Sequence, residues 1–327
     1  MEHGFAIWAN PSSPHGEGRK AKAALEDARD SVKRALGWDG ELIFTSGASE
    51  ALAIGLRRAK VERRIASAVE HDAVFRAAPD AELVPVANGE VDGEALAAAL
   101  AAPGCAVVAV QHVNSETGTI LSPFVEDVVA AKVREAGGLL LRDCAQSAGK
   151  VALPEADMLV VSAHKFGGPI GIGALLVRDF ALLEPSGGHE RGYRQGTENL
   201  PGALGLAAAL EAGGIDSWAS DIEMQLAFKN ALLRTGGMIQ PGFQSSYILA
   251  LTHPTLSAQA LLIRLDAMGF AVSAGSACSS GTLKKSRVLE AFGVDDETAA
   301  RTIRVSLGWS TTAEDLERFA QAWTALG

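Results

Sequence analysis

The sequence has few cysteines and no long apolar run, and each shortage excludes a class of protein. Three cysteines among 327 residues are too few and too scattered for a disulfide framework or a CxxC-type zinc site. No stretch approaches the roughly 18 uninterrupted apolar residues of a membrane-spanning helix, and the start MEHGFAIWANPSS has no charged-then-apolar leader. We therefore expect a cytoplasmic protein with no membrane span and no bound metal. Cys105 and Cys144 adjoin predicted strands and are expected to be small buried side chains.

Positive charge is also scarce. The chain has 29 Lys and Arg against 39 Asp and Glu, which gives a net charge of -10. Because no basic run offsets this balance, direct binding to nucleic acid is not expected. A chain of this length that is 48% hydrophobic can bury a large core and divide into a large and a small domain.

Seven apolar segments recur along the chain and predict strands, with helical patterns between them. They cover residues 42–45, 64–68, 82–86, 106–111, 139–142, 158–162 and 173–177. This alternation predicts an α/β fold with a mainly parallel sheet covered by helices on both faces. One helix is predicted from residue 16 to 36, ended by Gly37. The pattern changes near residue 215, so we expect a large domain over 1–214 and a smaller C-terminal α+β domain over 215–327.

Two polar groups follow predicted strands in the middle of the chain. Lys165 follows the strand at 158–162, in VVSAHKFGGPIGIGALLVR. It either extends into solvent, the commoner fate of a lysine, or forms a Schiff base with a carbonyl. Asp143 and Gln146 follow the strand at 139–142, at the edge where open parallel sheets bind ligands. A strand-end aspartate often caps a turn, but such a carboxylate also keeps the ring nitrogen of pyridoxal phosphate protonated.

A third signal is the segment ELIFTSGASEALAIGL, which predicts a strand, a tight turn and a helix N-terminus at residues 46–49. Free backbone N–H groups and the helix dipole bind phosphate at such a place, and Ser49 adds a hydroxyl. An ordinary helix N-cap followed by an acidic residue has the same pattern. This segment alone therefore leaves the two interpretations open.

Taken together, these segments resemble the cysteine desulfurases of the iron-sulfur-assembly group, within the class V aminotransferase family of fold type I pyridoxal-phosphate enzymes. The resemblance is carried by ANPSSPHGEG (9–18), FTSGASE (44–50), VEHDAV (69–74), HVNSETG (112–118), DCAQSAGK (143–150), SAHKFGGPIGIGAL (162–175), GGHERGYRQGTEN (187–199), SAGSACSSGTLKKS (273–286) and IRVSLG (303–308). The segments occur in the family's order over nearly the whole chain. The resemblance implies a homodimeric enzyme with pyridoxal 5'-phosphate as cofactor.

The resemblance also implies roles for individual residues. Lys165 would form the Schiff base with the cofactor and move the substrate α-proton, His71 would stack on the ring, and Thr197 would reach the phosphate of the neighbouring subunit's cofactor. The full set of implied cofactor contacts is Ala48, Ser49, His71, Asn114, Ser115, Asp143, Gln146, Ser162, His164, Lys165 and Thr197. Without the resemblance, a lone histidine after a strand is more often a structural hydrogen-bonding group.

Two residues near the C-terminus are implied to handle the substrate. Cys278, in SACSSG, matches the nucleophilic cysteine that takes sulfur from L-cysteine as a persulfide and leaves L-alanine. Taken alone, a single cysteine is more often inert. Arg304, in IRVSLG, can donate two parallel hydrogen bonds from its planar guanidinium to a substrate carboxylate. The alternative is that it forms an ion pair on the surface. The persulfide sulfur would pass to an iron-sulfur scaffold or another carrier protein.

The chain departs from the family pattern at several places. Ser115 stands where the family has an asparagine, Gly167 where it has a tyrosine, and Ile170 where it has a lysine. The family's LDNNATT-like opening is absent ahead of Asn10, so we expect this form to keep the fold but bind pyridoxal phosphate weakly and turn over cysteine poorly. The alternatives are another class V enzyme, such as a transaminase or selenocysteine lyase, and a cofactor-binding homologue with little activity.

Overall fold

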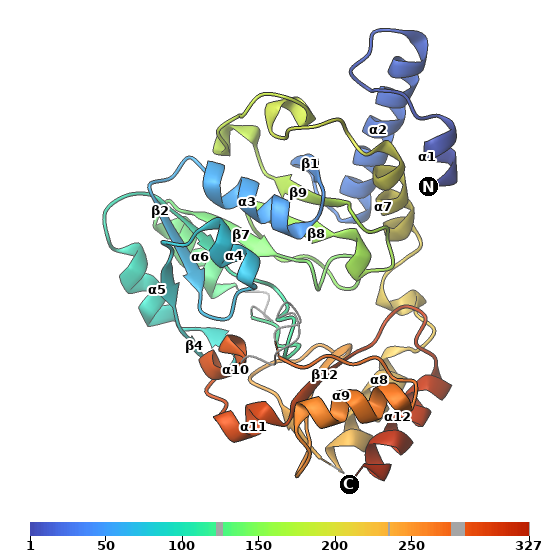
Figure 1. Cartoon of the computed structure of the whole chain (residues 1–327). Coiled ribbons are helices and arrows are strands. Elements are labelled where there is room, and N and C mark those ends of the chain that lie inside the picture. The colour runs from blue at the N-terminus through green and yellow to red at the C-terminus, as the bar shows by residue number, and fades with distance from the viewer. Residues whose placement is uncertain (122–126, 235, 276–284, 327) are drawn as a thin grey trace.

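A seven-stranded sheet forms the centre of the large part of the molecule (Figure 1). The computed structural model describes residues 1–121, 127–234, 236–275 and 285–326. Only β9 runs antiparallel to its neighbours in this sheet, so the mainly parallel sheet expected from the sequence is confirmed. In spatial order the strands are β1 (Glu41–Thr45), β9 (Gly173–Val177), β8 (Met158–Ser162), β7 (Leu139–Asp143), β6 (Ala106–Ala109), β2 (Arg63–Ser67) and β3 (Glu82–Val84).

Two of the seven predicted strands end two residues earlier than the sequence indicated. The segment 82–86 breaks at Pro85, which has no N–H to give to a sheet, and β4 (Val86–Ala87) pairs with β5 (Glu90–Val91) instead. The segment 106–111 ends at Ala109, and the N–H of Gln111 binds the side chain of Glu70 at 2.8 Å. That early ending leaves polar groups at the carboxyl edge of the sheet.

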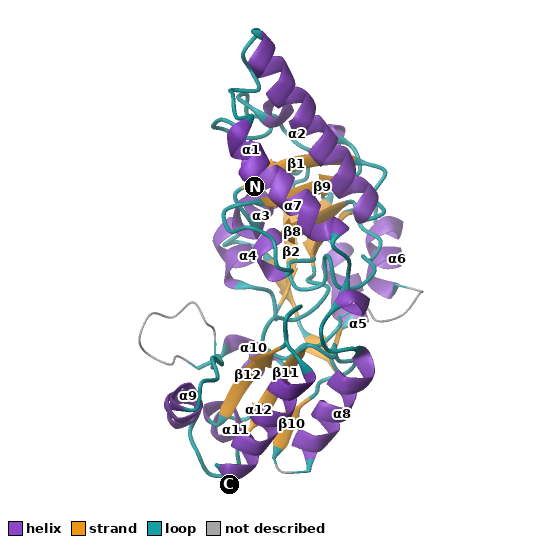
Figure 2. Cartoon of the chain, turned by 90° about the vertical axis from the view of Figure 1, so that its right-hand side faces the viewer, coloured by secondary structure: helices purple, strands orange, loops and turns teal. Residues whose placement is uncertain are grey.

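Helices cover both faces of the sheet. On one face, α2 (Gly16–Ala35) and α7 (Leu200–Glu211) pack over β1, β9 and β8, and α5 (Gly93–Leu100) and α6 (Val128–Glu135) pack over β7, β6 and β2. On the other face lie α3 (Ala48–Arg58) and α4 (Asp72–Ala77). Figure 2 shows α3 and α4 on one side of the sheet and α6 on the other.

The predicted helix beginning at residue 16 is α2, and it ends as the sequence indicated. Gly37 has a φ of 64°, a left-handed conformation that glycine adopts easily. The N–H of Trp38 then binds the carbonyl of Lys33 at 2.9 Å, and the N–H of Gly37 binds that of Arg34 at 3.2 Å. At the start of the chain, α1 (Glu2–Ala6) packs against α7.

A second, smaller sheet lies toward the C-terminus and has its own core (Figure 1). Its strands β10 (Gly237–Ile239), β11 (Ile248–Thr252) and β12 (Thr302–Ser306) are antiparallel. The helices α8 (Ile222–Leu233), α9 (Ala258–Ala267) and α12 (Ala313–Ala325) pack on it, and the short α10 (Arg287–Ala291) and α11 (Asp296–Ala300) precede β12. The domain boundary between residues 214 and 215 stays a prediction. Within the described ranges, no helix has both the length and the hydrophobicity to cross a bilayer.

The cysteines have different environments. Cys144 is fully buried, as predicted, and its burial raises the pKa of the thiol to about 12. The prediction for Cys105 was wrong, because it lies just before β6, remains partly exposed and directs its sulfur toward the carbonyl of Gly137 at 3.2 Å. Cys278 lies outside the described residues.

Candidate active site

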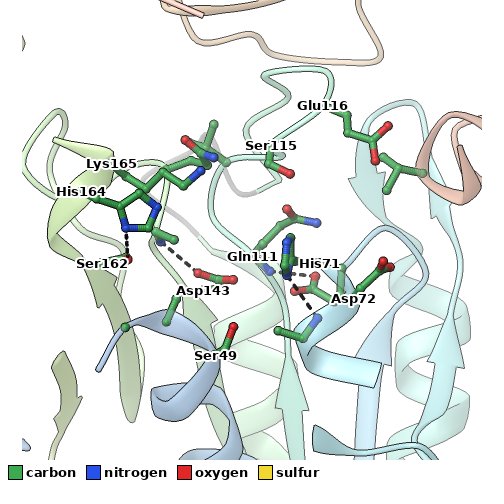
Figure 3. Close-up of a pocket in the computed structure, with 18 of the residues that line it drawn as sticks. Ser49, His71, Asp72, Gln111, Ser115, Glu116, Asp143, Ser162, His164 and Lys165 are labelled. Atoms are coloured by element: carbon green, nitrogen blue, oxygen red, sulfur yellow. Dashed lines mark hydrogen bonds between the residues drawn. The ribbon is translucent and has the colours of Figure 1, made fainter. Parts of the chain in front are cut away.

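A cavity of about 530 Å³ lies where the carboxyl ends of β7 and β8 meet the N-termini of α3 and α4. This is the edge at which open parallel sheets bind ligands. Figure 3 shows Lys165 and His164 on one side of the cavity, His71 on the other and Asp143 between them. The predicted residues that line the cavity are Ala48, Ser49, His71, Ser115, Asp143, Gln146, Ser162, His164, Lys165 and Arg304.

The N-terminus of α3 forms one end of the cavity. Its N-cap is Gly47, which provides no side chain to bind the N–H groups of the first helical turn. Next to it, the hydroxyl of Ser162 lies 3.0 Å from Nδ1 of His164. Burial lowers the pKa of His164, and the nearby positive charges of Lys165 and Lys150 lower it further. Backbone N–H groups, hydroxyls and an imidazole together make a cradle for an anion.

Asp143 forms the floor of the cavity and is the last residue of β7. The residue is 7% exposed, and its carboxylate accepts a hydrogen bond from the N–H of Ala145 at 2.9 Å. Burial raises the pKa of Asp143, although this hydrogen bond and the charges of His71 and Lys165 oppose the rise. A further positive group placed beside the carboxylate would favour its ionised form.

Lys165 lies at the end of a 3-10 turn (Ala163–Lys165) that follows β8. The chain then turns through Gly167, whose φ is 85°, and the N–H of Gly168 binds the carbonyl of Ala163 at 2.9 Å. A Cβ at Gly167 would approach the indole ring of Trp309 to 2.9 Å. The glycine that replaces the family's tyrosine is therefore covered by a tryptophan, a contact that the sequence analysis missed.

His71 and Glu70 lie on the opposite wall. His71 is the N-cap of α4, where its Nδ1 accepts a hydrogen bond from the N–H of Ala73 at 3.1 Å. The carboxyl of Glu70 is fully buried and accepts hydrogen bonds of 2.8 Å from the Ser67 hydroxyl and the Gln111 N–H. Burial raises its pKa to about 8, and the Asp143 charge adds to the rise. The sequence analysis missed Glu70, although it directly precedes His71.

Arg304 connects the small sheet to the cavity, because it lies on β12. Its Nη1 donates to the carbonyl of Ser115 at 3.0 Å and its Nη2 donates to the hydroxyl of Ser273 at 3.1 Å. The neighbouring carboxyl of Glu116 accepts a hydrogen bond of 2.5 Å from Ser286. Burial raises the pKa of Glu116, while that hydrogen bond and the Arg304 charge oppose the rise. Glu116 also lines the cavity and was not predicted.

Two of the predicted residues that the structure describes, Asn114 and Thr197, do not line the cavity. The Asn114 side chain is buried within its own turn, where its oxygen accepts from the N–H groups of Glu116 and Thr117 at 2.9 Å. Its nitrogen donates to the carbonyl of Val69 at 3.2 Å. Thr197 is exposed on the loop before α7, and Cys278 lies outside the described residues. Ser115, rather than Asn114, therefore faces the cavity.

The comparisons with known proteins agree with this geometry. Residues 5–319 match the aminotransferase class-V family. A cysteine desulfurase of Cereibacter sphaeroides is 35% identical over 96% of this chain and 87% of its own length. The chain belongs to the aminotransferase class-V family, among the cysteine desulfurases. A NifS-like protein from Rickettsia africae has a similar structure, with a TM-score of 0.87 and 25% identity over 99% of this chain and 94% of that one. The structure of SspA in complex with cysteine aligns with a TM-score of 0.77 and 27% identity, over 95% of this chain and 96% of that one.

Class-V enzymes of this kind depend on pyridoxal 5'-phosphate, and the cavity has groups suited to each part of that molecule. The uncapped N-terminus of α3 suits the phosphate, and the buried carboxylate of Asp143 suits a protonated ring nitrogen. Lys165 supplies the amine that such a cofactor requires. Among the described residues, no group of three or more His, Cys, Asp or Glu side chains is arranged to hold a metal ion.

Proposed function

We propose that this class-V enzyme converts L-cysteine to L-alanine and takes the sulfur onto Cys278 as a persulfide. The observation that supports this most directly is the meeting of Lys165, Asp143 and the N-terminus of α3 in one cavity. The relatives named cysteine desulfurase support the choice of substrate. Cys278 enters the proposal from its place in SACSSG alone.

Several side chains would hold the cofactor. We assign its phosphate to Ala48 and Ser49 at the start of α3, together with the hydrogen-bonded pair of Ser162 and His164. The remaining contacts lie around the ring. They are Asp143 at the nitrogen, Gln146 at the ring hydroxyl, His71 on one ring face and Ser115 near the edge, and all four residues line the cavity.

When bound, pyridoxal phosphate supplies an electron sink for the bonds at the substrate α-carbon. Lys165, which lines the cavity and carries the amine that such a cofactor requires, would be the base that takes the substrate α-proton. The buried carboxyl of Asp143 is favoured in its ionised form by a positive charge beside it, and in that form it would keep the ring nitrogen protonated. The Cys278 thiolate would attack the substrate sulfur, and the electron pair of the breaking carbon–sulfur bond would stay on the substrate. One proton added at the β-carbon and the return of the α-proton from Lys165 would then give L-alanine.

Arg304 would orient the substrate. Arg304 lines the cavity, and its two Nη groups donate to the Ser115 carbonyl and the Ser273 hydroxyl, which holds the guanidinium in place. A substrate carboxylate can accept both donors of one guanidinium, which a lysine cannot offer.

We further propose a cytoplasmic homodimer in which Thr197 reaches the phosphate of its partner's cofactor. Thr197 is exposed and does not line the cavity of its own chain, which is consistent with a contact made to another subunit. The acceptor of the persulfide sulfur would be an iron-sulfur scaffold or another carrier protein, as the sequence resemblance implies.

The proposal is tested by loading the protein with pyridoxal phosphate and measuring alanine from L-cysteine, together with the sulfide that dithiothreitol releases by reducing the persulfide. Cys278→Ser should keep the visible absorbance of the bound cofactor and still respond to L-cysteine, yet release no sulfide. Cys144→Ser is the matched control, because Cys144 is fully buried and its raised thiol pKa makes it a poor nucleophile. Wild-type sulfide release from Cys278→Ser would exclude Cys278 as the acceptor.

A further inference from the structure

Two buried side chains converge on the backbone of Gln146. Its carbonyl oxygen accepts a hydrogen bond from Nζ of Lys150 at 3.0 Å and a second from the hydroxyl of Tyr247 at 3.1 Å. Lys150 is 8% exposed and Tyr247 is 2% exposed. Because both lone pairs of this carbonyl are used by donors shielded from water, the orientation of its peptide plane is fixed.

The two donors also contact each other. Nζ of Lys150 lies 4.9 Å from the centroid of the Tyr247 ring, in the range of a cation–π interaction. Trp218 packs edge-on against the same ring, with 5.9 Å between centroids. Burial lowers the pKa of Lys150 to about 7, and the positive charge of Lys165 contributes to the shift. The Gln146 carbonyl and the Tyr247 ring contact this amine and oppose part of that destabilisation of its charged form.

Tyr247 belongs to the small sheet, although its hydroxyl reaches the turn after β7. It directly precedes β11, and its carbonyl accepts a hydrogen bond of 2.8 Å from the N–H of Leu307. Leu307 in turn directly follows β12, which carries Arg304. Tyr247 thus links the turn that presents Gln146, through its hydroxyl, to the strand that presents Arg304, through its backbone carbonyl.

We infer that Lys150 and Tyr247 form a clamp that positions Gln146 and couples it to the strand carrying Arg304. The inference rests on the proposed function, in which Gln146 contacts the cofactor ring and Arg304 the substrate. Lys150 and Tyr247 are positioning residues, because they act on the Gln146 backbone and not on the reacting atoms. Their loss should alter the environment of the bound cofactor as well as the rate.

The sharpest test is Tyr247→Phe, which removes the hydroxyl and keeps the ring. The loss of one buried hydrogen bond should lower kcat roughly three- to tenfold, weaken pyridoxal phosphate binding by a similar factor and shift the visible absorbance maximum. The chain offers a matched control in its other tyrosine. The Tyr193 hydroxyl also donates to a backbone carbonyl at 3.1 Å, that of Phe180, away from the cavity. Tyr193→Phe should leave kcat, cofactor affinity and absorbance unchanged.

Lys150→Met tests the other half of the clamp. It should reproduce the effects of Tyr247→Phe and also raise the pH at which the visible band of the bound cofactor changes, because a positive charge near Lys165 is removed. Unfolding in urea is followed in parallel for each variant. If Lys150→Met does not fold, the result for Tyr247→Phe decides.

Wild-type kcat, cofactor affinity and absorbance in Tyr247→Phe would overturn the clamp while leaving the proposed function intact. If the wild-type protein itself neither bound pyridoxal phosphate nor released sulfide, the proposed function would fall, and the clamp with it.

Discussion

Replacing Glu190 by glutamine should destabilise the protein by about 3 kcal/mol, the lower end of the cost of breaking a buried ion pair. Glu190 pairs with Arg29 of α2, and their side chains are 1% and 4% exposed. This ion pair holds the loop at residues 187–199, which carries Thr197, against α2. Loss of the negative charge on Glu190 leaves the buried guanidinium of Arg29 with less negative charge to offset its desolvation.

The magnitude follows from the hydrogen bonds of this one carboxylate. It accepts from Nη1 and Nη2 of Arg29 at 2.8 and 3.2 Å, and from the N–H of Phe44 at 2.9 Å. A glutamine amide has a single oxygen, so it cannot accept from all three donors. Glu26 remains beside Nε of Arg29 at 3.3 Å and the Leu42 carbonyl beside its Nη1 at 2.7 Å, which limits the loss.

The free energy of unfolding is measured by urea titration of the wild type and the variant. Glu155→Gln is the matched control, because Glu155 pairs with Arg134 on the surface, where the side chains are 70% and 64% exposed. That change should cost no more than about 1 kcal/mol. Arg29→Met combined with Glu190→Met should be less destabilised than Glu190→Gln, since no buried charge is left unpaired. A loss below about 1 kcal/mol in Glu190→Gln would refute this account of the buried pair.

Three further substitutions probe the cavity. Lys165→Ala should abolish the visible absorbance of the bound cofactor in a protein whose circular dichroism is unchanged, and a normal band would remove Lys165 from its role. Arg304→Lys should raise the half-saturating cysteine concentration more than about tenfold, because one ammonium cannot replace a two-point grip; an unchanged value would place Arg304 outside the substrate site. Glu70→Gln should flatten the dependence of stability on pH. The folded carboxyl, with a pKa of about 8, keeps a proton that the unfolded chain releases near pH 4.5, so wild-type stability should fall between about pH 5 and 8. Equal slopes in urea titrations across that range would contradict the assignment.

Much of the fold could be predicted from the sequence, because its local signals agree with its packing. In the helix from residue 16 to 35, the buried residues recur with the period of an α-helix. Gly37 follows its end and adopts the left-handed conformation that the turn there requires. The strands β7 and β8 are buried throughout and begin with apolar runs, as expected of strands covered on both faces. The strand predicted at 82–86 is interrupted at Pro85. Proline has no N–H for a sheet, so this interruption could have been predicted from the sequence.

The candidate site was predictable where its residues follow strands within motifs. Asp143 and Lys165 line the cavity because β7 and β8 are parallel neighbours that end at the same edge. Contacts between segments far apart in the chain are not marked by any local sequence pattern. The burial of Glu70 depends on the packing around β2 and β6, and the approach of Tyr247 to Gln146 depends on how the small sheet meets the large one.

A side chain at position 167 would conflict with Trp309, so we expect substitutions at these two positions to depend on each other. A tyrosine restored at Gly167 would meet the indole ring and would also have to adopt a φ of 85°. Truncating Trp309 relieves the first obstacle and leaves the second, so reversion toward the family pattern needs a rebuilt turn as well as a smaller neighbour. Homologues that share this glycine should therefore share a large side chain at position 309, and the two substitutions should have been fixed together rather than singly.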